Sequence, residues 1–158
     1  MSSTVAPSPI HLPASAGDTY YGPGDVYRFL VTGAETGGAY FAMEAIVPPG
    51  GGPPPHIHRN EDETFYVLEG QTEFLLDGEI VVAGPGDFVS VPRGAVHRFR
   101  NASDELTRLI LTFTPAGIEG FFRETLERAA DISAIPDNID EVAARYAEAA
   151  PRYGMHFL

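Results

Sequence analysis

The strongest constraint on the fold is a histidine-bearing segment framed by glycines. Between Gly50 and Gly70 the order is five residues, His56, one residue, His58, four residues, Glu63 and six residues. Side chains two apart on an extended strand leave the same face, so both imidazoles can reach one point. The polar residues RNED before Glu63 are typical of a turn, and the apolar run after it of a returning strand. The segment therefore predicts a hairpin that brings the carboxylate beside the imidazoles.

A second segment repeats this arrangement with one histidine. Gly86 is followed by five residues, Pro92, one residue, Gly94, two residues, His97, three residues and Asn101. The run DFVSV predicts a strand, the Pro-Arg-Gly that follows predicts a turn, and His97 falls on the next strand. A fourth ligand can therefore come from this hairpin.

Three imidazoles and one carboxylate are a suitable donor set for a metal ion. A lone His-x-His pair would equally suit two surface histidines or a core histidine, and it is the glutamate and the turn-forming frame that favour a metal site. With no cysteine in the chain, nitrogen and oxygen must hold the ion. Iron, nickel, cobalt, manganese or copper fit these donors, with zinc possible. Four protein ligands leave positions for water, substrate or O2, so Glu63 could be a permanent ligand or a catalytic base.

Together the two segments resemble the paired signature motifs of the cupins. Every defining position is matched, and 15 residues separate Gly70 from Gly86. The resemblance covers about residues 24–115. It implies an antiparallel β-barrel, a double-stranded β-helix or jelly roll, with one divalent transition metal ion inside. The implied ligands are His56, His58, Glu63 and His97.

The rest of the pattern predicts an all-β domain with a helical tail. We expect one cupin domain over residues 1–158, made of an N-terminal arm (1–24), a barrel core (25–115) and a tail (116–158). Short apolar runs between turn residues predict strands at 26–32, 39–47, 64–68, 72–76, 80–82, 88–91, 96–100 and 106–113. Apolar residues at helical spacing predict two C-terminal helices, near 116–130 and 139–150.

Strand alternation also predicts what surrounds the ion. Residues that share a face with Glu63 or His97, or that lie on the apolar faces of other strands, should line the cavity, although each could equally be ordinary core. The expected pocket residues are Phe41, Met43, Phe65, Phe99, Leu109, Leu111 and Phe113. Such a pocket suits an apolar or aromatic small molecule better than a sugar phosphate.

Charge and hydropathy exclude several function classes. The chain has 22 acidic and 10 basic residues, a formal charge of −12, and lacks the basic stripe that nucleic-acid binding requires. We interpret the excess of acidic residues as a property of a soluble protein surface. Within the acidic run 61–63, we expect only Glu63 to take part in the chemistry. Neither a signal peptide nor a membrane span is indicated, so the expected location is the cytoplasm. We expect a homodimer, because cupins commonly pair through their barrel edges.

The flanks of the first motif and the segment LTFTPAGIEGFFRE further resemble quercetin 2,3-dioxygenase-like cupins with a single barrel. This resemblance implies a metal-dependent dioxygenase that opens a ring of a flavonol or another enolic, polyphenolic compound with O2. Glu63 would be the catalytic base. Two other classes stay open: a metal-dependent isomerase, decarboxylase or lyase that uses the ion as a Lewis acid, and a non-catalytic small-molecule-binding cupin.

Overall fold

Alternation of buried and exposed side chains builds the barrel wall. In β5 (Asp62–Glu69), Glu63, Phe65 and Val67 are buried, whereas Tyr66 and Leu68 are exposed. This is the pattern expected when one face of a strand points inward and the other meets solvent. Glu63 therefore points into the same interior as the aromatic core.

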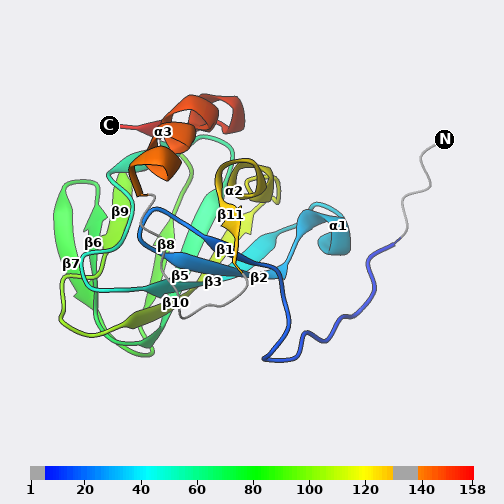
Figure 1. The fold of residues 1–158 in the computed structure, drawn as a ribbon, viewed down its shortest axis with the longest axis horizontal. Coiled ribbons are helices and arrows are strands. Elements are labelled where there is room, and N and C mark those ends of the chain that lie inside the picture. Colours follow the sequence, from blue (N-terminus) through cyan, green and yellow to red (C-terminus); the bar gives the residue numbers. More distant parts are fainter. Residues whose placement is uncertain (1–5, 130–138) are drawn as a thin grey trace.

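The computed structural model describes residues 6–129 and 139–158, and its strands form two antiparallel sheets (Figure 1). The larger sheet has the order β11-β1-β2-β3-β10-β5-β8, and the smaller has the order β12-β4-β9-β6-β7. Besides β5, the larger sheet contains β1 (Thr19–Tyr21), β2 (Val26–Val31), β3 (Phe41–Val47), β8 (Phe88–Val91), β10 (Thr107–Thr114) and β11 (Glu127–Arg128). The smaller sheet contains β4 (His56–His58), β6 (Thr72–Leu76), β7 (Glu79–Ala83), β9 (His97–Arg100) and β12 (Met155–Phe157).

The two longer helices pack together on one side of the sheets. The helical elements are α1 (Gly33–Thr36), α2 (Glu119–Thr125), α3 (Ile139–Ala149) and the 3-10 turn η1 (Ala150–Tyr153). In Figure 1, α2 and α3 lie on the same side of the molecule. Val142 and Tyr146 are the buried side of α3, and Phe121 packs its ring 4.7 Å from that of Tyr146. In the described ranges, no helix has the length and apolar character needed to span a bilayer.

The interior between the sheets is rich in aromatic rings. Phe41 lies 4.8 Å from Phe29 and 5.7 Å from Phe113, measured between ring centroids, and Phe65 lies 5.0 Å from Phe74. Aromatic pairs of this kind add about 0.5–1.5 kcal/mol each beyond the area they bury. The jelly-roll cupin barrel predicted from the sequence is confirmed by these two sheets.

The tail departs from the prediction in two places. The first tail helix ends at Thr125, not near residue 130, because Leu126 takes an extended conformation and β11 then pairs with β1. Residue 130 itself lies outside the described residues. The second helix, α3, agrees with the predicted 139–150, but the segment after it adds a strand that was not predicted, β12, which pairs with β4. The predicted arm contributes β1, and α1 occupies the turn predicted between β2 and β3.

Candidate metal centre

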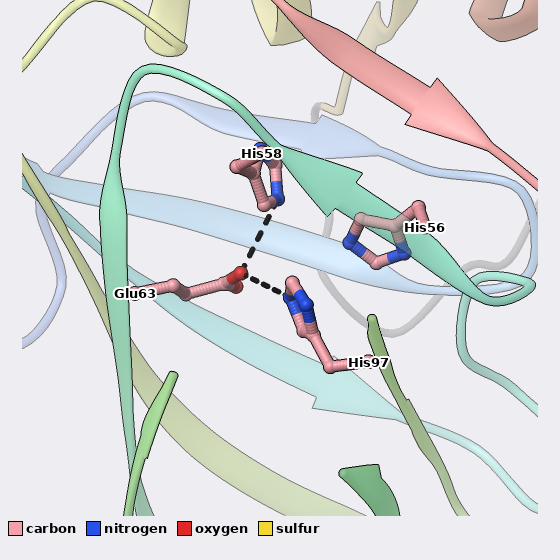
Figure 2. Close-up of side chains that lie close together, drawn as sticks. All are labelled: His56, His58, Glu63 and His97. Carbon is pink, nitrogen blue, oxygen red and sulfur yellow. Dashed lines mark hydrogen bonds and ion pairs between the residues drawn. The ribbon is translucent and has the colours of Figure 1, made fainter. Parts of the chain in front are cut away.

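Three strands bring four ligand-type side chains to one point. His56 and His58 extend from β4, His97 from the neighbouring β9, and Glu63 reaches them from β5 in the other sheet (Figure 2). His56 lies directly opposite His97 in the register of β4 and β9. All four residues are at most 3% exposed, and their ligand atoms lie within 4.8 Å of one another. The structure thus brings together the four residues that the sequence singled out.

Backbone carbonyls set the orientation of two imidazoles. Nδ1 of His56 lies 2.9 Å from the carbonyl oxygen of Pro54, and Nδ1 of His97 lies 3.0 Å from that of Ala95. A carbonyl can only accept, so the hydrogen of each ring belongs on Nδ1. In the neutral ring Nε2 then carries the lone pair, which is the form in which histidine binds metals. Without an ion, a proton on Nε2 of His97 makes the hydrogen bond to Glu63.

The Glu63 carboxylate lies at the centre of the cluster. Its Oε2 is 2.7 Å from Nε2 of His97 and 3.2 Å from Nε2 of His58. A carboxylate oxygen and a nitrogen lone pair repel at such distances unless a proton or a cation lies between them. The arrangement is therefore one that a positive charge at the centre would stabilise.

The pKa shifts in the cluster have identifiable causes. Burial alone would raise the pKa of Glu63, but hydrogen bonds and charge from His58 and His97 outweigh it and hold the pKa well below its usual range. Burial lowers the pKa of His56 to about 3, assisted by the neighbouring histidines. Burial also acts to lower the pKa of His97, but the Glu63 carboxylate more than offsets it and raises the pKa. Near neutral pH, Glu63 is ionised and His56 is neutral, as metal ligands must be.

The cluster also has the dimensions of a first-row metal site. With metal–ligand bonds of about 2.0–2.2 Å, neighbouring ligand atoms lie roughly 3 Å apart and opposite ones roughly 4 Å. The spread of up to 4.8 Å seen here exceeds the distance between opposite ligands by less than about 1 Å, so small side-chain shifts would close the four atoms around one ion. Three nitrogens and one oxygen suit divalent transition metals. The four side chains could therefore hold one such ion.

A fifth residue, also acidic, lies beside the cluster and was not predicted from the sequence. Glu61 is 4% exposed, and its Oε2 lies 3.7 Å from Nδ1 of His58. Neither atom has a hydrogen-bond partner among the described residues. The expectation that only Glu63 of this acidic run contributes chemistry stays a prediction, but it did not anticipate that Glu61 is buried beside His58. Glu61 lies just before β5 begins, but counting back two residues from Glu63 with the parity of that strand would have indicated it.

The cavity beside the cluster holds about 20 Å³, which is room for roughly one water molecule. Of the seven residues expected to line it, Met43, Phe99, Leu111 and Phe113 do so. The other three, Phe41, Phe65 and Leu109, are buried in the surrounding core and do not line it. The alternation along a strand tells which face a residue lies on, but not how far along the strand that residue lies from the metal cluster. The sequence analysis did not anticipate the remaining lining residues, Tyr27, Pro53, Phe122, Tyr146 and Met155.

Comparison with known proteins agrees with this geometry. Residues 43–113 match the family described as Cupin domain. The chain is 32% identical over 115 residues to quercetin 2,3-dioxygenase from Bacillus subtilis, covering 73% of this chain and 34% of that protein. It is 31% identical over 118 residues to quercetin 2,3-dioxygenase from Aspergillus japonicus, covering 70% and 33%. The chain thus spans about a third of the length of these two relatives.

Among solved structures, the fold is similar to that of KdgF from Halomonas sp. The TM-score is 0.62 and the identity 20%, with 72% of this chain and 98% of that chain covered. At this identity the likeness concerns the fold alone.

Proposed function

We propose that the chain, whose residues 43–113 match the cupin domain family, is a metal-dependent dioxygenase acting on a flavonol-like or other enolic, polyphenolic small molecule. Its likeness to two quercetin 2,3-dioxygenases supports this proposal. The observation that carries the proposal is the ionised, buried Glu63 carboxylate facing three imidazole nitrogens in an aromatic cavity. A site of this kind can accept a proton from an acidic hydroxyl and keep water away from the product.

Each part of the site has a role in this reaction. When bound, a divalent ion would act as a Lewis acid and lower the pKa of a substrate hydroxyl. His56, His58 and His97 would hold that ion, and the carbonyls of Pro54 and Ala95 fix the rings of His56 and His97 through Nδ1, which leaves Nε2 as the ligand atom. Glu63 accepts the hydroxyl proton at Oε2 as general base.

The wall of this small cavity, which has room only for the reacting edge of a substrate, determines the polarity of the group that can lie beside the ion. Met43, Phe99, Leu111 and Phe113 offer apolar surface and no charge, which favours a planar, largely apolar molecule over a phosphorylated one. Their burial also excludes bulk water, so that an ionised substrate is not reprotonated by solvent before it meets O2.

Oxygen uptake is the test of this function. We would strip the protein of metal, reconstitute it separately with iron, nickel, cobalt, manganese, copper and zinc, and measure O2 uptake and carbon monoxide release with quercetin. At least one ion should give uptake with carbon monoxide, and Glu63→Gln should lower the rate by about 10² to 10⁴-fold.

Two outcomes would assign another function. Turnover of an enolic substrate that is undiminished without oxygen would identify a metal-dependent isomerase, decarboxylase or lyase. Tight binding of quercetin without any product under every ion would identify a small-molecule-binding cupin.

A further inference from the structure

A second, larger cavity lies outside the metal cavity and shares a wall with it. It holds about 370 Å³, and its lining includes Pro54, Ala143, Ala147 and Phe157. Tyr146 and Pro53 line both cavities. The side chain of Tyr146 therefore lies between the interior beside the histidines and this outer pocket.

The two cavities differ in volume and therefore in what they can hold. At about 20 Å³ the inner cavity has no room for an organic molecule. The outer pocket, at about 370 Å³, is within the range of roughly 300–1,000 Å³ that small-molecule sites occupy. No charged side chain lines it among the described residues. Its ligand should therefore be a predominantly apolar molecule.

The hydroxyl of Tyr146 is the polar feature of this boundary. Tyr146 is 5% exposed, and its hydroxyl has no hydrogen-bond partner among the described residues. Its ring is already held by Phe121, 4.7 Å away, and by a stacked contact with Phe157 at 6.3 Å. A phenylalanine would make the same ring contacts without leaving a buried donor unsatisfied. The hydroxyl thus points to a partner other than the described residues.

We propose that the outer pocket binds the apolar body of the substrate, a flat arene carrying a hydroxyl or carbonyl group, and that Tyr146 hydrogen-bonds this oxygen. Tyr146 is then a specificity-determining residue that directs the oxygen-bearing edge of the ring towards His56, His58 and Glu63. The substrate class in this proposal rests on the proposed function. The position of the binding site is argued only from the outer pocket and from Tyr146.

Two neighbouring alanines on α3 give a matched test of the pocket. Ala143 and Ala144 are both exposed, but only Ala143 lines the outer pocket. We would measure binding of 2-naphthol, a flat arene with one hydroxyl, to wild type, Ala143→Trp and Ala144→Trp without oxygen. Ala143→Trp should weaken binding at least about tenfold, and Ala144→Trp should change it less than about twofold. Equal binding by the two variants, or no binding by wild type, would overturn the proposal.

Comparison of two probes tests Tyr146 itself. Tyr146→Phe should weaken binding of 2-naphthol by about threefold to tenfold, the value of one hydrogen bond, and leave binding of naphthalene unchanged. A purely structural role would weaken both probes together. Unchanged 2-naphthol binding by Tyr146→Phe would remove Tyr146 from the proposal.

These measurements need no turnover, so they fail independently of the dioxygenase assay. If 2-naphthol binds as described and quercetin causes no O2 uptake, the pocket stands and the oxygenase is rejected. If quercetin is oxidised equally fast by Ala143→Trp and Ala144→Trp, the oxygenase stands and the pocket is rejected.

Discussion

Each histidine of the candidate metal centre has a neighbour behind it. Backbone carbonyls of Pro54 and Ala95 lie against His56 and His97, whereas a side chain, Glu61, lies near Nδ1 of His58. Such partners fix the ring and raise its basicity as a ligand. Glu61 is the one partner of the three that a substitution can remove.

Glu61→Gln should lower metal affinity by about 10 to 100-fold, because His58 loses the carboxylate behind its ring. Metal titration with a competing chelator would measure this. Asp62→Asn is the matched control, since Asp62 is the adjacent carboxylate and its side chain is 49% exposed. Equal affinities in the two variants would show that Glu61 does not support His58.

Asp25 gives the fold a pH dependence. It is 1% exposed, and burial raises its pKa to about 7, although the Tyr27 hydroxyl donates to it at 2.7 Å and opposes the shift. The Asp25 carboxyl stays protonated to a higher pH in the folded chain than in the unfolded chain. Its contribution to the free energy of unfolding is therefore fully present below about pH 4 and is lost as pH rises through about 7.

Between pH 4 and 7, the free energy of unfolding of wild type should therefore fall relative to Asp25→Asn by about 2–4 kcal/mol. Urea denaturation in the presence of chelator, repeated across this pH range, would measure the difference. Parallel curves for the two proteins would show that Asp25 ionises normally in the fold.

At the scale of elements, the site depends on how the short strand β4 is held. Only three residues long, β4 lies between β9 and β12 and carries both His56 and His58. The loop before it must run close to β9. Gly52 makes this possible, because its φ is +124° and an added Cβ would overlap the carbonyl oxygen of Phe99.

Gly52→Ala should therefore lower the free energy of unfolding by more than about 2 kcal/mol and weaken metal binding. Gly50→Ala is the control. Its φ of +81° is also left-handed, but an added Cβ meets nothing within 4 Å, so about 1 kcal/mol of backbone strain is expected. Thermal melts would rank the two variants, and a Gly52→Ala protein as stable as Gly50→Ala would contradict the close approach.

The sequence predicted the strands between residues 26 and 114 well, because their alternation and turn residues are local signals. It predicted the clustering of His56, His58, Glu63 and His97 for the same reason, since each lies in a hairpin with its own turn. The tail was less predictable. The apolar spacing continues through Leu126, but pairing of β11 with β1 ends the helix, and no local pattern indicated that β12 would pair with β4.

At the scale of the whole molecule, β7 leaves an apolar edge. It is the last strand of the smaller sheet, on the side opposite β12. Ile80 is 54% exposed, Val81 41% and Val82 61%, so both faces of this strand meet solvent. Natural sheets usually protect such edges with charge or cover. A second copy of the chain that packs against β7 would bury this apolar edge.

We therefore expect a homodimer that forms through β7. Light scattering after size exclusion should give twice the chain mass for wild type and the monomer mass for an Ile80→Lys, Val82→Lys double variant. A dimer that survives both lysines would place the interface elsewhere, and a monomeric wild type would reject the dimer.

The most direct measurement is the metal content of the protein after incubation with each candidate ion and removal of excess. Wild type and a His11→Ala, His156→Ala control, which keeps the four clustered residues, should each retain about one equivalent of at least one transition metal. A His56→Ala, His58→Ala variant, shown to be folded by circular dichroism, should retain almost none. Equal metal in the two double variants, or a wild type that retains none of the ions, would contradict the metal site.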